Sequence, residues 1–149
     1  MPITHWEDLV EGRPLPCRTL CFSKEEIIEF ARKYDPQPFH VDEAAAATSI
    51  FGGIIASSLH TLSATTRVIV DALGELAIVS GLGMDEILMP NPVRPGDELT
   101  VAAHWSGLRR SRSKPGVGIA GVRCRLVNQH GTTVMEFGFR YMVACRETT

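Results

Sequence analysis

A carboxylate and an imidazole stand five positions apart in the segment Tyr34-Asp35-Pro36-Gln37-Pro38-Phe39-His40. The two prolines restrict the backbone, so Asp35 and His40 would be held in place at little entropic cost. A carboxylate paired with an imidazole can hold a water, remove one of its protons and supply a proton elsewhere. Addition or elimination across a polarised C=C bond requires these steps. The alternative is that Asp35 only satisfies loop amides and His40 is an ordinary loop residue.

A second candidate segment is Phe51-Gly52-Gly53, which leads into Ile54-Ile55-Ala56-Ser57-Ser58. Glycines before a helix allow a ligand to approach the backbone, and unpaired amides of a first helical turn can stabilise an oxyanion on a thioester carbonyl. The alternative is that the glycines only form a turn. His60 follows inside the expected helix, where a hydrogen-bonded core residue is favoured over a third catalytic group.

Three helical segments would position these residues. Ser23-Lys24-Glu25-Glu26 is a capping box that starts a helix, and Pro36 disfavours the α conformation at Asp35, so this helix ends near Tyr34. The segment from Asp35 to His40 is then a stiff loop. Asp42 can cap a short Ala-rich turn through Ala47. Small and apolar residues from Ile54 to Leu73 predict a helix that is buried on most sides.

The second half of the chain changes to an alternating pattern. Apolar residues recur at every second position from Leu99 to Trp105 and from Phe137 to Val143, which predicts half-buried strands. Further strands are expected from about Val117 to Val127 and over 77–89. Turns are expected at Pro95-Gly96-Asp97 and Asn128-Gln129-His130-Gly131. Helices followed by antiparallel strands predict an α+β fold, and residues 1–149 are expected to form a single domain.

Composition limits the classes of partner. The chain has 149 residues, of which 44% are hydrophobic and 21% charged, with a formal net charge of −2. Without a basic excess, we expect no binding to nucleic acid or to an anionic bilayer. The first residues lack a charged leader followed by an apolar segment, and no apolar run could span a membrane, so we expect a cytoplasmic protein. The four cysteines lack metal-site spacing, so we expect unpaired thiols and no metal.

Four ordered segments, YDPQPFH, FGGIIASSLHT, NPVRPGDEL and RSRSKPGVG, resemble those of the MaoC-like dehydratases and R-specific enoyl-CoA hydratases. The resemblance covers about Phe22 to Val143. It implies a hotdog fold, in which an antiparallel sheet wraps a long central helix, and a protein that works at least as a homodimer. It also implies an acyl-CoA or acyl-carrier thioester as substrate, no separate cofactor and a role in fatty acid metabolism.

In that family the D-x-N-P-x-H loop supplies the catalytic pair, which falls on Asp35 and His40. This implies reversible hydration of a trans-2-enoyl thioester to a 3-hydroxyacyl thioester, the reaction of a hydratase or dehydratase lyase. Asp35 would take a proton as water attacks C3, and His40 would help to deliver a proton to C2. Backbone amides near Ile54 and Ser58 would polarise the thioester carbonyl.

The sequence departs from the family pattern at two places. The usual Asn of the loop is Gln37, and the His-Gly pair at the start of the central helix is Ser57-Ser58. The oxyanion and substrate-binding candidates are Gln37, Gly53, Ile54, Ser57 and Ser58, and the candidates for contact with CoA phosphates are Arg109, Arg112 and Lys114. The basic run could instead be a solvated hairpin tip. Two other functions remain open: an acyl-CoA thioesterase, and an acyl-thioester-binding subunit without turnover.

Overall fold

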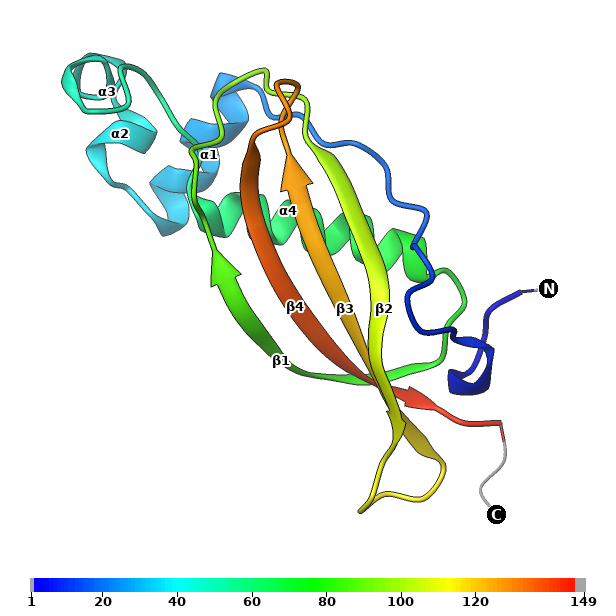
Figure 1. Ribbon diagram of the computed structural model, residues 1–149. Helices are drawn as coiled ribbons and strands as arrows, with labels where there is room; N and C mark the ends of the chain where they lie inside the picture. Colours follow the sequence, from blue (N-terminus) through cyan, green and yellow to red (C-terminus); the bar gives the residue numbers. More distant parts are fainter. Residues whose placement is uncertain (1, 147–149) are drawn as a thin grey trace.

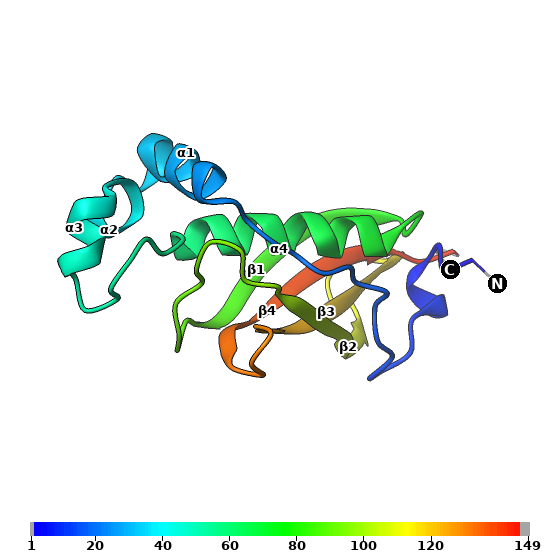
Figure 2. The ribbon, with the colours of Figure 1, turned by 90° about the horizontal axis from the view of Figure 1, so that it is seen from above.

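The computed structural model describes residues 2–146, and its centre is one antiparallel sheet. The strands are β1 (Ile78–Leu88), β2 (Thr100–Arg110), β3 (Val117–Val127) and β4 (Thr133–Ala144), in the spatial order β1-β4-β3-β2. The sheet curves around helix α4 (Ser58–Leu73), which lies across one of its faces (Figures 1 and 2). The predicted α+β arrangement of a sheet on one long helix is thereby confirmed.

The predicted alternation of apolar and polar residues is present in the strands, and the apolar residues form the face of the sheet that packs on the core. In β2, Val101, Ala103 and Trp105 are buried, whereas the residues between them are exposed or half-buried. These three lie opposite Leu126, Cys124 and Val122 of β3, which are also buried. Both predicted turns form, and Gly96 and Gly131 adopt positive φ angles of 81° and 75° in them. Because glycine has no Cβ, such angles are accessible to it without strain.

Three short helices lie together at one end of α4 (Figure 2): α1 (Lys24–Tyr34), α2 (Pro38–Val41) and α3 (Glu43–Thr48). The capping box before α1 is confirmed, because the Glu26 amide donates to Ser23 Oγ at 3.1 Å and the Ser23 amide donates to Glu26 Oε1 at 3.3 Å. Asp42 caps α3, as predicted, by accepting from two amides of its first turn. Helix α2 was missed by the prediction, which treated the whole segment from Asp35 to His40 as a loop.

Helix α4 starts four residues later than predicted, at Ser58 instead of Ile54. The preceding residues are extended because their amides bind elsewhere: the Ile55 amide donates to the Phe39 carbonyl, and the Ala56 amide donates to the Val93 carbonyl. Ser57 is the N-cap of the helix. The amide of Ile54 is therefore not part of the first helical turn, contrary to the prediction.

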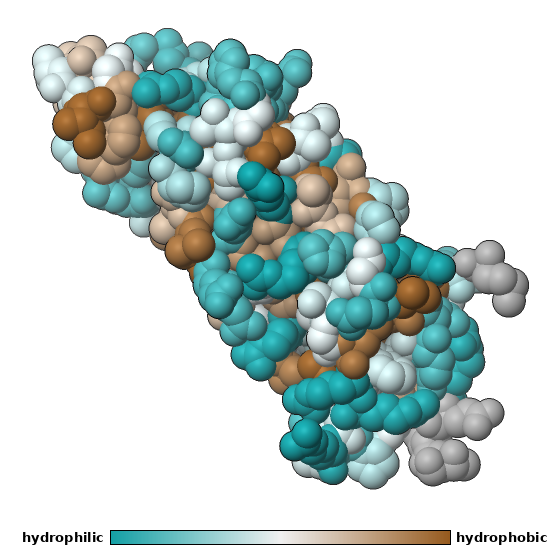
Figure 3. Space-filling model, viewed as in Figure 1, coloured by the Kyte–Doolittle hydropathy of each residue, from teal (hydrophilic) through white to brown (hydrophobic). Residues whose placement is uncertain are grey.

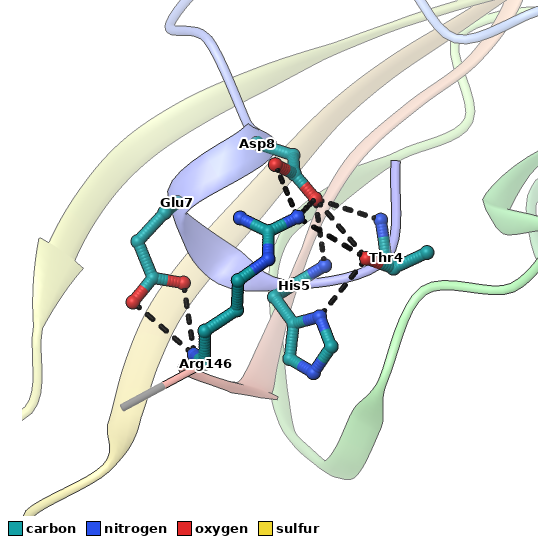
Figure 4. Close-up of polar contacts among 5 residues, drawn as sticks. All are labelled: Thr4, His5, Glu7, Asp8 and Arg146. Carbon is teal, nitrogen blue, oxygen red and sulfur yellow. Dashed lines mark hydrogen bonds and ion pairs between the residues drawn. The ribbon is translucent and has the colours of Figure 1, made fainter. Parts of the chain in front are cut away.

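The two ends of the described chain are joined by a cluster of polar contacts (Figure 4). The short helix η1 (Trp6–Asp8) carries Glu7 and Asp8; Asp8 accepts from the Arg146 guanidinium at 2.6 Å, and Glu7 accepts from the Arg146 amide at 3.1 Å. The Trp6 indole lies on Gly118 of β3, where a larger residue would overlap the ring. These contacts hold η1 against β3 and the residues after β4, at the end of the sheet opposite α2 and α3.

Candidate active site

Asp35 and His40 are brought together by the turn between α1 and α2. Helix α1 ends at Tyr34, and Pro38 occupies the first turn of α2, which carries His40. His40 Nε2 lies 3.4 Å from Asp35 Oδ2, and its other nitrogen, Nδ1, lies 2.7 Å from the Ile55 carbonyl oxygen. Since a carbonyl only accepts, Nδ1 carries a proton, and Nε2 is the nitrogen that faces the carboxylate. His40 is buried, with 4% of its surface exposed.

Two further side chains hold the Asp35 carboxylate. The Gln37 amide donates to Asp35 Oδ1 at 2.7 Å, and the Ser57 hydroxyl donates to Asp35 Oδ2 at 2.7 Å. The Gln37 and Ser57 hydrogen bonds keep the pKa of Asp35 below its ordinary value, because both stabilise the ionised form. Gln37 and Ser57, two of the residues at which the sequence departs from the family pattern, therefore contact the same carboxylate.

The N-terminus of α4 forms the adjoining wall of the site. Ser57 is fully buried, and its Oγ also accepts from the Leu59 amide at 3.2 Å. The amides of His60 and Thr61 donate to the Ser57 carbonyl, but the Ser58 amide has no partner among the described residues. An unpaired N–H in the first turn of a helix is suited to an oxyanion.

These groups lie in the wall of a cavity of about 600 Å³. Apart from the polar wall, the cavity is lined by apolar side chains from α2, the loop between α3 and α4, helix α4, the end of β1, the segment after it and the start of β4. These include Phe39, Phe51, Leu59, Leu62, Ile87, Met89, Val93, Val134 and Met135. The cavity can thus place a hydrocarbon chain beside a carboxylate and an imidazole.

The structure brings some of the predicted site residues together and separates others. Asp35, Gln37, His40, Ser57 and Ser58 all line the cavity, whereas Gly53 and Ile54 do not. Ile54 instead packs in the hydrophobic core. The extended chain before α4 explains the difference, since it separates these two residues from the first turn of the helix.

The basic run lies far from this cavity in the same chain. Arg109 is at the end of β2, and Arg112 and Lys114 follow in the hairpin between β2 and β3. This hairpin projects from the end of the sheet opposite α2 and α3 (Figure 1). None of the three residues lines the cavity. Their contact with CoA phosphates stays a prediction, which requires the ligand or a second protomer to span this distance.

His60 departs from the prediction of a hydrogen-bonded core residue. Its ring is stacked between Phe22, with centroids 4.2 Å apart, and Phe30, at 4.6 Å. Its Nδ1 is buried and has no hydrogen-bond partner within residues 2–146. Burial lowers the pKa of His60, because a charged imidazolium would lose its hydration there. His60 does not line the cavity.

Several residues of the cavity wall could not be predicted from the sequence. The Ile55 carbonyl, which orients His40, and the apolar side chains of Ile87, Val134 and Met135 are brought to the site only by long-range packing. Within the described part of the chain, no three His, Cys, Asp or Glu side chains are grouped as a metal ion would require. Nor is any helix there long and apolar enough to cross a membrane.

Comparison with known proteins gives consistent matches. A family model described as a MaoC like domain matches residues 7–127. The uncharacterized protein YdeM of Bacillus subtilis is 31% identical over 132 residues, which cover 87% of this chain and 92% of YdeM. The crystal structure of the MaoC-like dehydratase from Rhodospirillum rubrum has a TM-score of 0.86 at 37% identity, over 96% of this chain and 98% of that one.

A more distant structure has a described activity. The (R)-hydratase from A. caviae involved in PHA biosynthesis has a TM-score of 0.73 at 27% identity, over 92% of this chain and 97% of that one. The fold is the hotdog fold, a description also given to a double-hotdog protein from Mycobacterium tuberculosis. That protein has a TM-score of 0.76 at 18% identity, over 99% of this chain and 46% of that one.

Proposed function

The chain belongs to the MaoC-like domain family, and we propose that it catalyses the reversible hydration of a trans-2-enoyl thioester to a 3-hydroxyacyl thioester. One observation carries this proposal: Asp35 and His40 meet at 3.4 Å in the wall of a cavity that is otherwise mainly apolar. A hydrocarbon chain fits the apolar part, and the pair is placed for water activation beside it.

The proton transfers can be written around this pair. A water held between Asp35 and His40 attacks C3 of the substrate, and Asp35 accepts one of its protons. His40, protonated at Nε2, gives a proton to C2. The proton on Asp35 then passes to His40 Nε2 across the 3.4 Å contact, which restores the starting state. The Ile55 carbonyl keeps Nδ1 protonated throughout, so Nε2 is the nitrogen that exchanges protons.

The thioester carbonyl is assigned to the N-terminus of α4. Negative charge develops on its oxygen as water adds at C3, and the Ser58 amide can donate to that oxygen. The dipole of a sixteen-residue helix acts in the same direction. Because this donor is a backbone group, the change from Gly to Ser at this position does not remove it.

The test follows the loss of the conjugated enoyl-thioester absorbance with a panel of trans-2-enoyl-CoAs. Asp35→Asn and His40→Ala should each lower kcat/KM by about 10²–10⁴-fold, the usual contribution of a general acid or base. Asp71→Asn is the matched control, since Asp71 lies on the exposed side of α4 and pairs with Arg67. Full activity of Asp35→Asn would contradict the proposal.

The two alternative functions give different results in the same experiment. A thioesterase would release the CoA thiol from enoyl and saturated acyl-CoAs alike, which a thiol reagent detects. A binding subunit would retain acyl-CoA affinity in the wild type and in Asp35→Asn, with no turnover in either. The hydratase is favoured because the carboxylate is paired with an imidazole, a pairing suited to taking a proton from the water that attacks C3 and giving a proton to C2.

A homodimer or higher homo-oligomer is part of the proposal. Strand β1 is an edge of the sheet and exposes several apolar side chains in or directly after it, and Figure 3 shows apolar surface near its end. These side chains are Ile78, Val79, Leu82, Ile87, Leu88 and Met89. An exposed apolar edge strand is a site for pairing with another chain. Size-exclusion chromatography with light scattering tests this, and a monomer at micromolar concentration would contradict it.

A further inference from the structure

Strand β1 contains an irregularity beside the cavity. Asp85 lies opposite Gly138 of β4, and Leu88 lies opposite Glu136, so that two residues of β1 face Phe137 alone. This is a β-bulge with one extra residue. Glu86, the first of the two, has a φ of 48° and is the one non-glycine residue with positive φ among residues 2–146. A left-handed conformation is uncommon for a residue with a side chain.

The bulge decides which side chain of β1 meets the cavity. Glu86 lies 3.5 Å from the guanidinium of Arg123, whose neighbours in β3 are buried in the core and which therefore faces the side of the sheet away from α4. Ile87 lines the cavity. Successive residues of a regular strand alternate between the two faces. Without the extra residue, Ile87 would share the face of Asp85, and Glu86 would be turned towards the cavity.

We propose that the bulge at Glu86 makes Ile87 a specificity-determining residue, whose side chain limits the length and branching of the acyl chain. The identity of the ligand as an acyl thioester rests on the proposed function. The sheet side of the cavity explains why Ile87 has this role: of its lining residues, Val134 and Met135 of β4 are 2% and 1% exposed and are packed in the core, whereas Ile87 is 40% exposed on an edge strand. Its size can therefore vary without opening a hole in the core.

The first experiment varies Ile87 and measures kcat/KM for trans-2-enoyl-CoAs from crotonyl-CoA to dodecenoyl-CoA. Ile87→Ala should raise the ratio of long to short substrates by about tenfold or more, since one methylene in an apolar pocket changes discrimination by about 10–200-fold. Ile87→Phe should shift the ratio in the opposite direction. Val70→Ala is the matched control, because Val70 is exposed on α4 and does not line the cavity. An equal change for every chain length would overturn the proposal.

A second readout separates this inference from the proposed function. Saturated acyl-CoAs from butyryl-CoA to dodecanoyl-CoA bind without hydration, and calorimetry gives their Kd for the wild type and for Ile87→Ala. If no enoyl-CoA is hydrated, the proposed function fails, but a shift of the tightest-binding chain length in Ile87→Ala still supports the inference. The same order of affinities in both proteins, or no binding to either, would overturn it.

The bulge itself is tested at Glu86. Glycine adopts positive φ freely, so Glu86→Gly should keep the wild-type chain-length profile. Valine is strongly disfavoured at positive φ, so Glu86→Val should shift the profile in the way that loss of Ile87 does, with a lower Tm. A wild-type profile and Tm for Glu86→Val would show that the bulge does not place Ile87. If that variant does not fold, a changed profile in Glu86→Gly would contradict the proposal.

Discussion

The hydroxyl of Ser57 gives the sharpest test of how Asp35 is tuned. It donates to Asp35 Oδ2 at 2.7 Å in a fully buried position. A hydrogen bond to a charged group contributes about 1.5–3 kcal/mol, which corresponds to about tenfold or more in an equilibrium constant. Ser57→Ala should therefore raise the pKa of Asp35, while the Gln37 bond remains. Asp35 must be ionised to accept a proton from water, so the acid limb of kcat/KM should move to higher pH, and kcat/KM at a fixed pH on that limb should fall by about tenfold or more.

The measurement is the pH profile of kcat/KM with crotonyl-CoA for the wild type, Ser57→Ala and Ser63→Ala. Ser63 is the matched control because it lies on the same helix and its hydroxyl donates to the Leu59 carbonyl at 2.8 Å. Ser57 also caps α4, so its loss should lower the free energy of unfolding by about 0.5–2 kcal/mol, which urea denaturation measures separately. An acid limb that stays in place in a folded Ser57→Ala protein would refute the reasoning.

Three further predictions concern stability, each measured by urea denaturation. Gly118→Ala should lower the free energy of unfolding by about 1–3 kcal/mol, because the added methyl overlaps the Trp6 ring; an unchanged value would contradict the packing. Arg146 keeps the pKa of Asp8 below its ordinary value, so the stability that this pair supplies is present at neutral pH and is lost as the pH falls. Arg146→Ala should be less stable than the wild type at pH 7, and the difference should shrink in acid. Burial lowers the pKa of His60, so the wild type should lose stability as the pH falls below about 6.5. His60→Phe should remove that part of the loss. The same pH dependence in this variant and in the wild type would contradict a contribution from His60.

The parts of the fold that could be predicted from the sequence are those with a local cause. The capping box at Ser23, the restriction that Pro36 places on Asp35 and the glycine at position 96 each act within a few residues. The alternation in β2 also has a local cause, because one face of the strand packs on the core and the other does not. Such signals lie within a short stretch of sequence, so they can be read without knowing which segment the stretch packs against.

The errors occur where distant segments decide the structure. The start of α4 depends on hydrogen bonds from Ile55 and Ala56 to Phe39 and Val93, none of which is visible in the local pattern. The apolar run therefore predicted a helix from Ile54 that the tertiary structure replaces with an extended segment. The bulge in β1 is another such case, because the register of a strand is set jointly with its neighbour.

The pairing of Asp35 and His40 was expected from their residue types and spacing and from the resemblance, but the way in which the carboxylate is held was not. Gln37 and Ser57 differ from the family pattern, and the sequence alone left open whether these changes weaken the site. Each of them donates to a different oxygen of Asp35, and together they favour its ionised form. Ser57 also accepts from the Leu59 amide, so one hydroxyl joins the first turn of α4 to the carboxylate. Gln37 and Ser57 therefore act together to orient one ionised base towards His40, which supports turnover over passive binding of a thioester.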